Sequence, residues 1–365
     1  MSRHDSIARS IVSAIRNGRR NRSRSVLSLI FAILSSIFSF FQLNLQKIRP
    51  LYFANLRRNH WDVDDDAYIE SFRSRDSLKS IGDMGFSGSS FYATSDQKYL
   101  VKSVPRHSEH SFFRDDLLTP YVQHMESYPN SMLVRIFDFL GPRGPSIGRA
   151  LGLAPSHHIV MENIMRGQDQ TEEQGRAALW EKWDLKPASY FYPERDIADG
   201  RLTSDSTKRQ LADEFHDTIA LTREQSGRFF ASLELDTKLL ADHNAVDYSL
   251  FLVRITPQGS GSPRQEAAPE EPSGSDATPG KAPLAVPEPQ SWRTGIASRD
   301  GKHVFRAVLL DFFWAKHKSR PRLMTLLITL WNLVGRHGHM SITTTPDEYR
   351  ERFLKMCRDI VVVED

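Results

Sequence analysis

The chain has 365 residues, of which 39% are hydrophobic and 25% are charged, and its formal net charge is +3. This composition is typical of a globular protein, and the length is sufficient for one large or two moderate domains. The single cysteine, Cys357, excludes an intrachain disulfide and a cysteine-built zinc site, and it suits a reducing compartment. The arginines near the start of the chain have no interleaved aromatic residues, so the sequence does not favour nucleic-acid binding.

Residues 1–48 form an N-terminal segment that is basic at first and apolar afterwards. The run 25–46 contains no charged residue and is long enough to span a bilayer. Its polar residues recur at helical spacing, which favours an amphipathic helix that lies on a membrane or packs in the core. A true membrane span and a cleaved signal peptide are the alternatives. We therefore expect a cytoplasmic protein that is peripheral to a membrane, with this segment as a candidate anchor.

From residue 49 onward, helical and strand-like patterns follow one another along the chain. The first part predicts two helices over 49–72, a β-hairpin over 81–104, a helix over 109–127, and strands over 132–140 and 158–165. The second part predicts strands over 182–185 and 189–192, helices from 204 to 239, strands over 247–255 and 304–313, and helices over 320–334 and 346–360. Thr344 or Thr345 is placed to cap the last helix.

Residues 256–291 are rich in Pro, Gly, Ser, Ala and Glu and have almost no aromatic or β-branched side chain. Such a segment cannot bury enough apolar surface to fold, so we expect a disordered insertion that links two neighbouring strands of one sheet. The remaining pattern predicts a bilobal, kinase-like α+β fold with antiparallel sheets flanked by helices. Its N-terminal nucleotide-binding lobe covers 49–165, and its C-terminal catalytic lobe covers 166–365.

The hairpin carries the first candidate chemistry, because its first turn is rich in glycine and serine. Backbone N–H groups in such a turn can point at phosphate oxygens, and Lys102 on the next strand can reach the same phosphates. Asp247 begins one apolar strand and Asp311 ends another. Either aspartate alone would more simply cap a turn, but a metal ion is also a partner for such a carboxylate. Together with Lys102, in this order, the two aspartates indicate phosphoryl transfer from a nucleotide.

The sequence is not that of an ordinary protein kinase. It lacks the His-Arg-Asp catalytic loop and has Asp-Phe-Phe at 311–313 in place of Asp-Phe-Gly. From about residue 50 to the C-terminus it instead resembles the phosphatidylinositol phosphate kinases. The resemblance rests on the hairpin with Lys102 and on the segments 161–163, 183–186, 235–251, 309–311 and 345–353.

The resemblance implies an ATP- and Mg²⁺-dependent kinase that phosphorylates the inositol ring of a phosphoinositide at an anionic membrane surface. The residues that it places around ATP are Gly85, Ser87, Gly88, Ser89, Lys102, Glu109, Met161 and Asn163, with Glu109 as the ion-pair partner of Lys102. It makes Asp311 a ligand of Mg²⁺, and Asp247 the catalytic base or the second carboxylate of the metal site. Lys186 would lie near the phosphates or the substrate headgroup. The basic cluster that would face the headgroup or the bilayer comprises Lys316, Lys318, Arg320 and Arg322.

Two departures from the family pattern bear on activity. Phe86 stands in the glycine-rich turn where the family usually has a lysine, and Pro187-Ala188 replaces Gly-Ser. Proline there removes a backbone donor. The alternative function is therefore a catalytically weak, kinase-fold scaffold that binds lipid at a membrane, and ligases of the SAICAR-synthase type share the same architecture. The sequence leaves open the ring position that is phosphorylated and whether the chain forms a homodimer.

Overall fold

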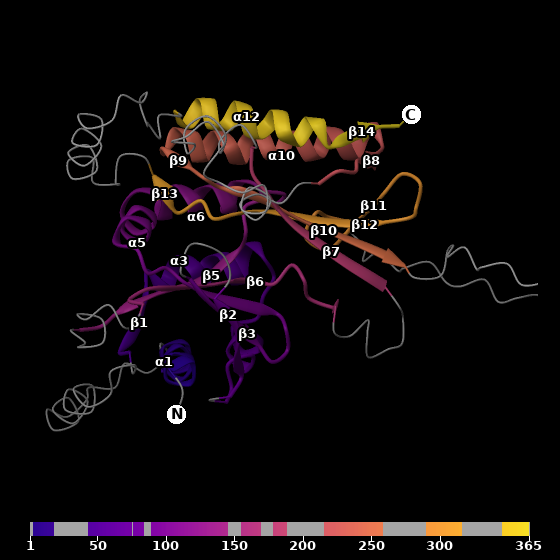
Figure 1. Ribbon diagram of the computed structural model, residues 1–365. Coiled ribbons are helices and arrows are strands. Elements are labelled where there is room, and N and C mark those ends of the chain that lie inside the picture. Colours follow the sequence, from indigo (N-terminus) through magenta and orange to yellow (C-terminus); the bar gives the residue numbers. More distant parts are fainter. Residues whose placement is uncertain are drawn as a thin grey trace, which may run out of the picture.

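The computed structural model describes residues 3–17, 43–74, 76–83, 89–144, 155–168, 178–187, 215–257, 290–315 and 345–364. Within these ranges the fold is a mixed α+β arrangement of two main antiparallel sheets with helices around them, as the sequence predicts (Figure 1). The elements predicted over 189–192 and 320–334 lie outside the described residues. So do residues 25–42 of the helix predicted over 25–46, residues 204–214 of the helical stretch predicted over 204–239, and residues 258–289 of the insertion expected over 256–291.

The N-terminal half is built on a six-stranded sheet in the order β1-β5-β6-β4-β3-β2. Its strands are β1 (Leu45–Ile48), β2 (Leu78–Asp83), β3 (Ser90–Thr94), β4 (Tyr99–Ser103), β5 (Ile136–Pro142) and β6 (His158–Glu162). The expected hairpin is present, because β3 and β4 pair across the polar turn 95–98. The antiparallel register places Lys102 of β4 between Phe91 of β3 and Ile159 of β6.

Helices pack around this sheet. They are α1 (Arg3–Asn17), α3 (Pro50–Asn55), the π-helix η1 (Leu56–His60), α4 (Asp65–Glu70), α5 (His107–Phe112), the π-helix η2 (Phe113–Leu117) and α6 (Leu118–Ser127). The helices predicted over 49–72 and 109–127 are therefore present. The first helix of 49–72 ends in the π-helical turn η1, and the helix predicted over 109–127 is interrupted by η2. Figure 1 shows α5 and α6 between the N-terminal sheet and the C-terminal half.

Helix α1 lies on the side of the N-terminal sheet that is remote from the C-terminal half (Figure 1). It packs against both edge strands, β1 and β2, and buries one side of its surface, including Ile7, Ile11 and Ile15. The apolar run predicted as a helix over 25–46 is described only at its end, where Leu45 and Gln46 belong to β1 and not to a helix. Among the described residues, no helix has the length and apolarity needed to cross a membrane.

The C-terminal half is built on a four-stranded sheet in the order β11-β12-β10-β7. Its strands are β7 (Ala178–Leu185), β10 (Ser249–Pro257), β11 (Ile296–Ala297) and β12 (Val304–Leu310). The insertion lies between β10 and β12, and these strands pair directly, as predicted. Two short pairs complete this half: β9 (Ala245–Val246) with β13 (Trp314–Ala315), and β8 (Ile219–Leu221) with β14 (Val361–Val363).

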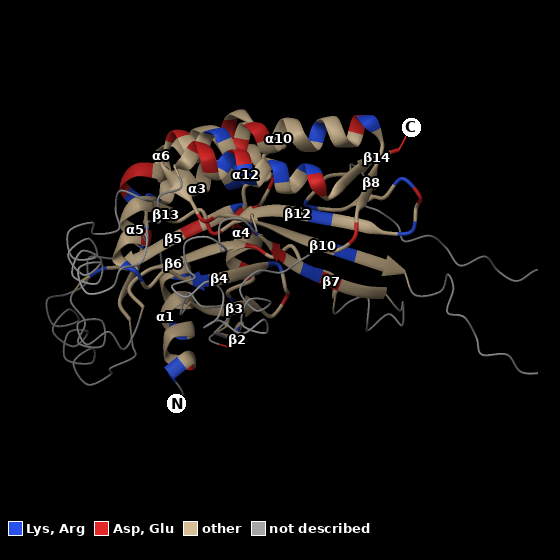
Figure 2. Cartoon of the chain, turned by 45° about the horizontal axis from the view of Figure 1, so that its top comes forward, with Lys and Arg blue, Asp and Glu red and all other residues tan. Residues whose placement is uncertain are grey.

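Helices α10 (Arg223–Asp242) and α12 (Pro346–Asp359) lie side by side over one face of the C-terminal sheet (Figure 1). Figure 2 shows that both helices contain residues of both charge signs, as expected of a solvated layer. Thr345 caps α12, since its hydroxyl oxygen accepts a hydrogen bond from the N–H of Glu348 at 3.1 Å. Cys357 of α12 is fully buried, and burial raises the pKa of its thiol, as the packing interpretation requires.

One local prediction is wrong. Residues 219–221, which fit a helical period, form strand β8, because they pair in parallel with β14 near the other end of the chain. A distant strand partner decides the structure here, and no local pattern contains that partner. By contrast, the strand predicted over 158–165 is present as β6, and its first residue, His158, is fully buried.

Candidate active site

Three strands of the C-terminal sheet bring the candidate catalytic residues to one end. Strand β10 pairs with β12 on one side and with β7 on the other, so that Ser249 lies opposite Leu310 and Leu250 lies opposite Leu185. Asp247 precedes β10, Asp311 follows β12 and Lys186 follows β7. Because all three strands reach the same edge, these three side chains meet there.

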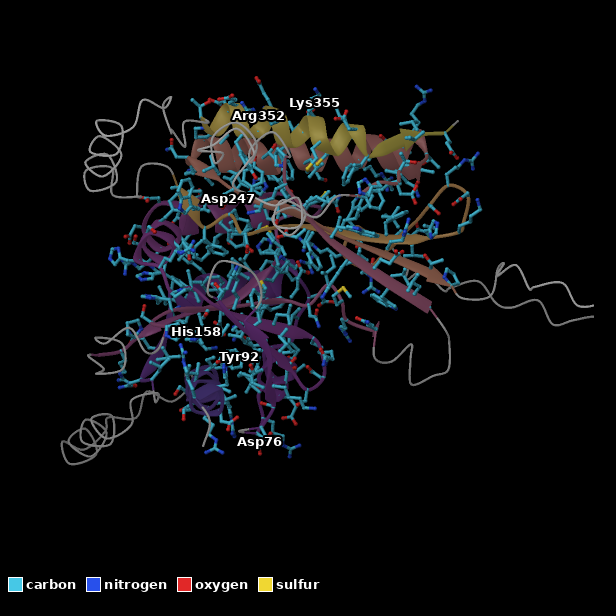
Figure 3. All side chains as sticks on the ribbon, in the orientation of Figure 1. Asp76, Tyr92, His158, Asp247, Arg352 and Lys355 are labelled. Carbon is cyan, nitrogen blue, oxygen red and sulfur yellow. The ribbon has the colours of Figure 1, made fainter. Side chains whose placement is uncertain are left out.

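At this edge the chain passes from one strand to the next through an aspartate at two places. Asp247 connects β9 to β10, and Asp311 connects β12 to β13, while β9 and β13 pair with each other through Val246 and Trp314. Both aspartates have left-handed backbone conformations, with φ of 65° and 63°. Such conformations are costly for residues other than glycine and are concentrated at functional sites. In Figure 3, Asp247 lies beneath α10 and α12, on the side that faces the N-terminal half.

Lys102 connects the two halves at this point. It comes from the middle of the N-terminal sheet, and its ammonium group donates a hydrogen bond to a carboxylate oxygen of Asp311. The Lys102 side chain is 8% exposed, whereas that of Asp311 is 38% exposed. The lysine therefore lies at the buried inner end of the site, and the carboxylate lies toward solvent.

A second ion pair lies next to the first. Lys186 donates a hydrogen bond to Asp247 at 2.8 Å, and its side chain is 16% exposed. Burial lowers the pKa of Lys186, but the charges of Asp247, Asp311 and Asp184 outweigh burial and raise it above its usual value. Burial likewise raises the pKa of Asp311, but Lys102 and then Lys186 outweigh this and hold it below its usual value. The two pKa shifts thus favour the charged forms of Lys186 and Asp311.

Asp184 is a third carboxylate in this cluster, and the sequence analysis assigned it no role. Burial of its carboxyl group, together with the charge of Asp311, raises the pKa of Asp184, and the charges of Lys186 and Lys102 act in the opposite direction. Asp184 is two residues before Lys186 in an extended segment, so both side chains lie on the same face. This spacing was the signal in the sequence that could have identified it.

Glu109 is not the ion-pair partner of Lys102. Its carboxylate accepts a hydrogen bond from Arg106 at 3.0 Å, one turn earlier along the chain, while Lys102 binds Asp311. Glu109 nevertheless lies within the electrostatic reach of the pair. Burial raises the pKa of Glu109, the charges of Arg106 and Lys102 lower it, and the charge of Asp311 adds to the increase.

The expected ATP-contacting segment 161–163 lies at the end of β6. Met161 is buried within the sheet, 4% exposed. Asn163 donates from its side-chain amide to the carbonyl oxygen of Gln97 at 2.8 Å and accepts a hydrogen bond from the N–H of Met165 at 3.1 Å. Its amide therefore fixes the turn of the hairpin to the segment that leads out of the N-terminal half. Ser89, at the end of the glycine-rich turn, is buried next to β3.

Several predicted site residues lie outside the described part of the chain. These are Gly85, Ser87 and Gly88 of the glycine-rich turn, together with Phe86, and the basic residues Lys316, Lys318, Arg320 and Arg322. Of the dipeptide that departs from the family pattern, Pro187 is described and buried, and Ala188 is not described.

The chemistry of the cluster fits Mg²⁺ and ATP phosphates. Within the described ranges, no group of three metal-ligating side chains forms a preassembled cation site. Mg²⁺ does not need one, because it is commonly held by one or two carboxylates together with substrate phosphates and water. Asp311 and Asp247 are carboxylates that could do this, and Lys102 and Lys186 are cations that could bind phosphate oxygens.

Comparison with known proteins identifies the family of the chain. A family model described as phosphatidylinositol-4-phosphate 5-kinase matches residues 72–360. Phosphatidylinositol 4-phosphate 5-kinase 3 of Arabidopsis thaliana is 24% identical over 203 residues, which cover 56% of this chain and 26% of the plant protein. A probable phosphatidylinositol phosphate kinase of Dictyostelium discoideum is 28% identical over 204 residues, covering 54% and 24% of the two chains. The matched region is thus about a quarter of the length of these curated relatives. With a family match over most of its length, the chain belongs to the phosphatidylinositol-4-phosphate 5-kinase family.

Proposed function

We propose that the chain is an ATP-dependent phosphatidylinositol phosphate kinase, which transfers the γ-phosphoryl group of ATP to an inositol-ring hydroxyl of a phosphoinositide at a membrane surface. Its two halves would be the lobes of a kinase-like fold, with ATP between them. The relatives named above are described as kinases of this class, which supports the proposal.

One observation carries the proposal. Two lysines and the aspartates that they bind converge at one strand edge, although Lys102 and Asp311 are 209 positions apart and Lys186 and Asp247 are 61 positions apart. Phosphoryl transfer needs mainly positioned cations, metal-binding carboxylates and a group that accepts the proton of the attacking hydroxyl. The cluster offers each of these groups within one connected network of charges.

The residues can be assigned roles on this basis. Lys102 would bind the phosphates of ATP, and Asp311 would hold Mg²⁺, which neutralises the charge that develops on the transferred phosphoryl group. Asp247 would accept the proton of the inositol hydroxyl. The hydroxyl oxygen would meanwhile form the new bond to phosphorus as the bond from phosphorus to the ADP oxygen breaks. Lys186, which donates a hydrogen bond to Asp247, would keep this carboxylate oriented until then. The glycine-rich turn 84–88 would cover the phosphates, and the basic residues of 316–322 would meet the lipid headgroup.

The test is phosphate transfer from labelled ATP to vesicles that contain mixed phosphoinositides, with and without Mg²⁺. Wild type, Asp311→Asn and the control Asp242→Asn should be compared, since Asp242 is an aspartate of α10 that pairs only with Lys238 among the described residues. We expect labelled lipid with wild type and Asp242→Asn and none with Asp311→Asn. If the folded wild type binds the vesicles but labels no lipid, the kinase proposal is wrong and the lipid-binding scaffold takes its place.

A further inference from the structure

We infer that Arg293 is a positioning residue of this kinase. It holds the segment 131–134, which connects the two halves and is called the joint below, and thereby fixes the position of Lys102 relative to Asp311. The inference deepens the proposed function and rests on it. Arg293 belongs to the C-terminal half and lies between the insertion and β11, yet its guanidinium group binds only groups of the N-terminal half among its described contacts.

The joint is the segment 131–134, between α6 and β5. It runs beside β12 of the C-terminal sheet, where the N–H of Leu309 donates to the carbonyl oxygen of Met132 at 2.7 Å. The N–H of Val134 donates in turn to the carbonyl oxygen of Leu309 at 3.0 Å. Two backbone hydrogen bonds thus attach the N-terminal half to the strand that ends next to Asp311.

Arg293 binds the opposite edge of the same segment. Carbonyl groups alternate in direction along an extended chain, so those of Ser131 and Leu133 point away from β12. The guanidinium group donates to the Ser131 carbonyl oxygen at 2.6 Å and also to that of Leu133. The joint is therefore held from both sides by groups of the C-terminal half.

The same guanidinium group forms an ion pair with Glu162, the last residue of β6. That carboxylate also accepts a hydrogen bond from the N–H of Arg135 at 2.8 Å, next to the joint. Strand β6 pairs with β4, the strand that carries Lys102. A displacement of Arg293 would consequently move the joint and the strand neighbouring Lys102 together.

The backbone of Arg293 is itself fixed to the C-terminal core. The indole ring of the preceding residue, Trp292, is 9% exposed and lies with its centroid 4.4 Å from that of Phe229 in α10. The carbonyl oxygen of Trp292 accepts a hydrogen bond from the N–H of Ala307 in β12 at 2.8 Å. Arg293 can therefore act as a rigid arm from the C-terminal half.

The chemistry of the contact favours a positioning role over a merely stabilising one. The side chains of Arg293 and Glu162 are 12% and 16% exposed, and a buried ion pair adds little net stability because both charges lose water. What such a pair does supply is geometry, since a planar guanidinium group can satisfy three acceptors in one arrangement.

The experiment compares Arg293→Met with Arg293→Lys, Glu162→Gln and the double variant Arg293→Met with Glu162→Gln. Arg254→Met is the matched control. The Arg254 side chain is 15% exposed, close to the 12% of Arg293, and it binds two carboxylates, Glu181 and Asp217, which belong to its own half. The readouts are KM for ATP and kcat, affinity for a non-hydrolysable ATP analogue, and amide hydrogen exchange at 131–136 and 162–166.

We expect Arg293→Met to raise KM for ATP and the dissociation constant of the analogue by about tenfold or more, with a smaller change in kcat. Exchange at both segments should rise. Arg293→Lys should be intermediate, since one ammonium group cannot span the same acceptors, and Glu162→Gln should add little in the Arg293→Met background.

The inference is wrong if KM for ATP, analogue affinity and hydrogen exchange are the same in Arg293→Met as in Arg254→Met. If Arg293→Met does not fold, the same comparison is made with Arg293→Lys and Glu162→Gln. A failure of the proposed function looks different. Wild type would then transfer no phosphate, while hydrogen exchange would still report whether Arg293 holds the joint.

Discussion

Asp247 and Asp311 have the same left-handed backbone conformation, at two points where the chain leaves one strand and enters another. Because the neighbouring strands pair with each other, the two aspartates are held as a matched pair at one edge of the sheet. A left-handed conformation costs about 1–2 kcal/mol for an ordinary residue, and asparagine and aspartate tolerate it best among residues with a side chain. The positions thus tolerate few residue types on backbone grounds alone.

Asp247→Asn should fold as wild type does but lose activity. Asparagine keeps the backbone conformation and the size of the side chain, but it cannot accept the proton of the attacking hydroxyl. We expect kcat to fall by about 10²–10⁴-fold, the usual contribution of a positioned base. Circular dichroism and thermal unfolding provide the control for folding. Activity within a few-fold of wild type would remove Asp247 from the role of base.

Lys102→Met should abolish ATP binding and raise the pKa of Asp311. In the wild type burial raises the pKa of Asp311, but Lys102 together with Lys186 outweighs burial, so the pKa is lowered. A carboxyl group with a lowered folded-state pKa stabilises the fold above its unfolded-state pKa, and this contribution is lost as pH falls through the folded-state value. NMR titration of the aspartate carboxyl carbons would measure the shift.

The control for this titration is Lys98→Met, because Lys98 forms its ion pair at 3.6 Å with Asp96 in the turn of the hairpin. It should leave the titration of Asp311 unchanged. An Asp311 pKa that is the same in Lys102→Met and wild type would show that the ion pair does not form in solution.

The burial of His158 predicts that the free energy of unfolding falls at acidic pH. The residue is fully buried, neither ring nitrogen has a hydrogen-bond partner among the described residues, and burial lowers its pKa to about 3 (Figure 3). The unfolded chain binds a proton near the usual pKa of about 6.5, so stability is lost as pH falls from there toward 3. At pH 4.5 this loss is about 2–3 kcal/mol.

His158→Phe should therefore flatten the dependence of the unfolding free energy on pH between 4.5 and 7, measured by urea denaturation, relative to wild type. His216→Phe serves as the control, because His216 is exposed. Equal slopes in wild type and His158→Phe would show that another group is responsible for the acid sensitivity.

Asp236→Ala should be among the most destabilising changes in α10. The carboxylate is fully buried, lies 2.6 Å from Nε2 of His124, and accepts hydrogen bonds from the Ser131 hydroxyl at 2.7 Å and from the N–H of Met132. Its loss leaves several buried donors without an acceptor, at a cost of about 3 kcal/mol or more. Urea denaturation measures this cost, and Asp242→Ala in the exposed last turn of α10 should cost far less.

The sequence could predict those parts of the site that depend on local pattern. The hairpin, Lys102 on its second strand, and the two aspartates at the ends of apolar strands are all visible in short windows, as is the capped helix α12. The family resemblance supplied their order. The outcome at the strand edge agrees with this, because Lys102, Lys186, Asp247 and Asp311 do lie together.

What the sequence could not predict depends on partners far away along the chain. The resemblance paired Lys102 with Glu109, whereas the fold brings Asp311 to it and leaves Glu109 with Arg106. Residues 219–221 form a strand only because β14 is present beside them. Arg293 has no local sign of importance in the sequence, since its partners come from two other segments.

The position of α1 has a consequence for the order in which the chain folds. Its apolar side, with Ile7, Ile11 and Ile15, packs on β1 and β2, the two edge strands of the N-terminal sheet. These strands belong to one sheet only after all six strands have paired, and the last of them along the chain, β6, ends at Glu162. Contacts of such long sequence separation form late. While the ribosome is still making the sheet, α1 is an amphipathic helix without its partner, and that is when a chaperone or a bilayer can capture it.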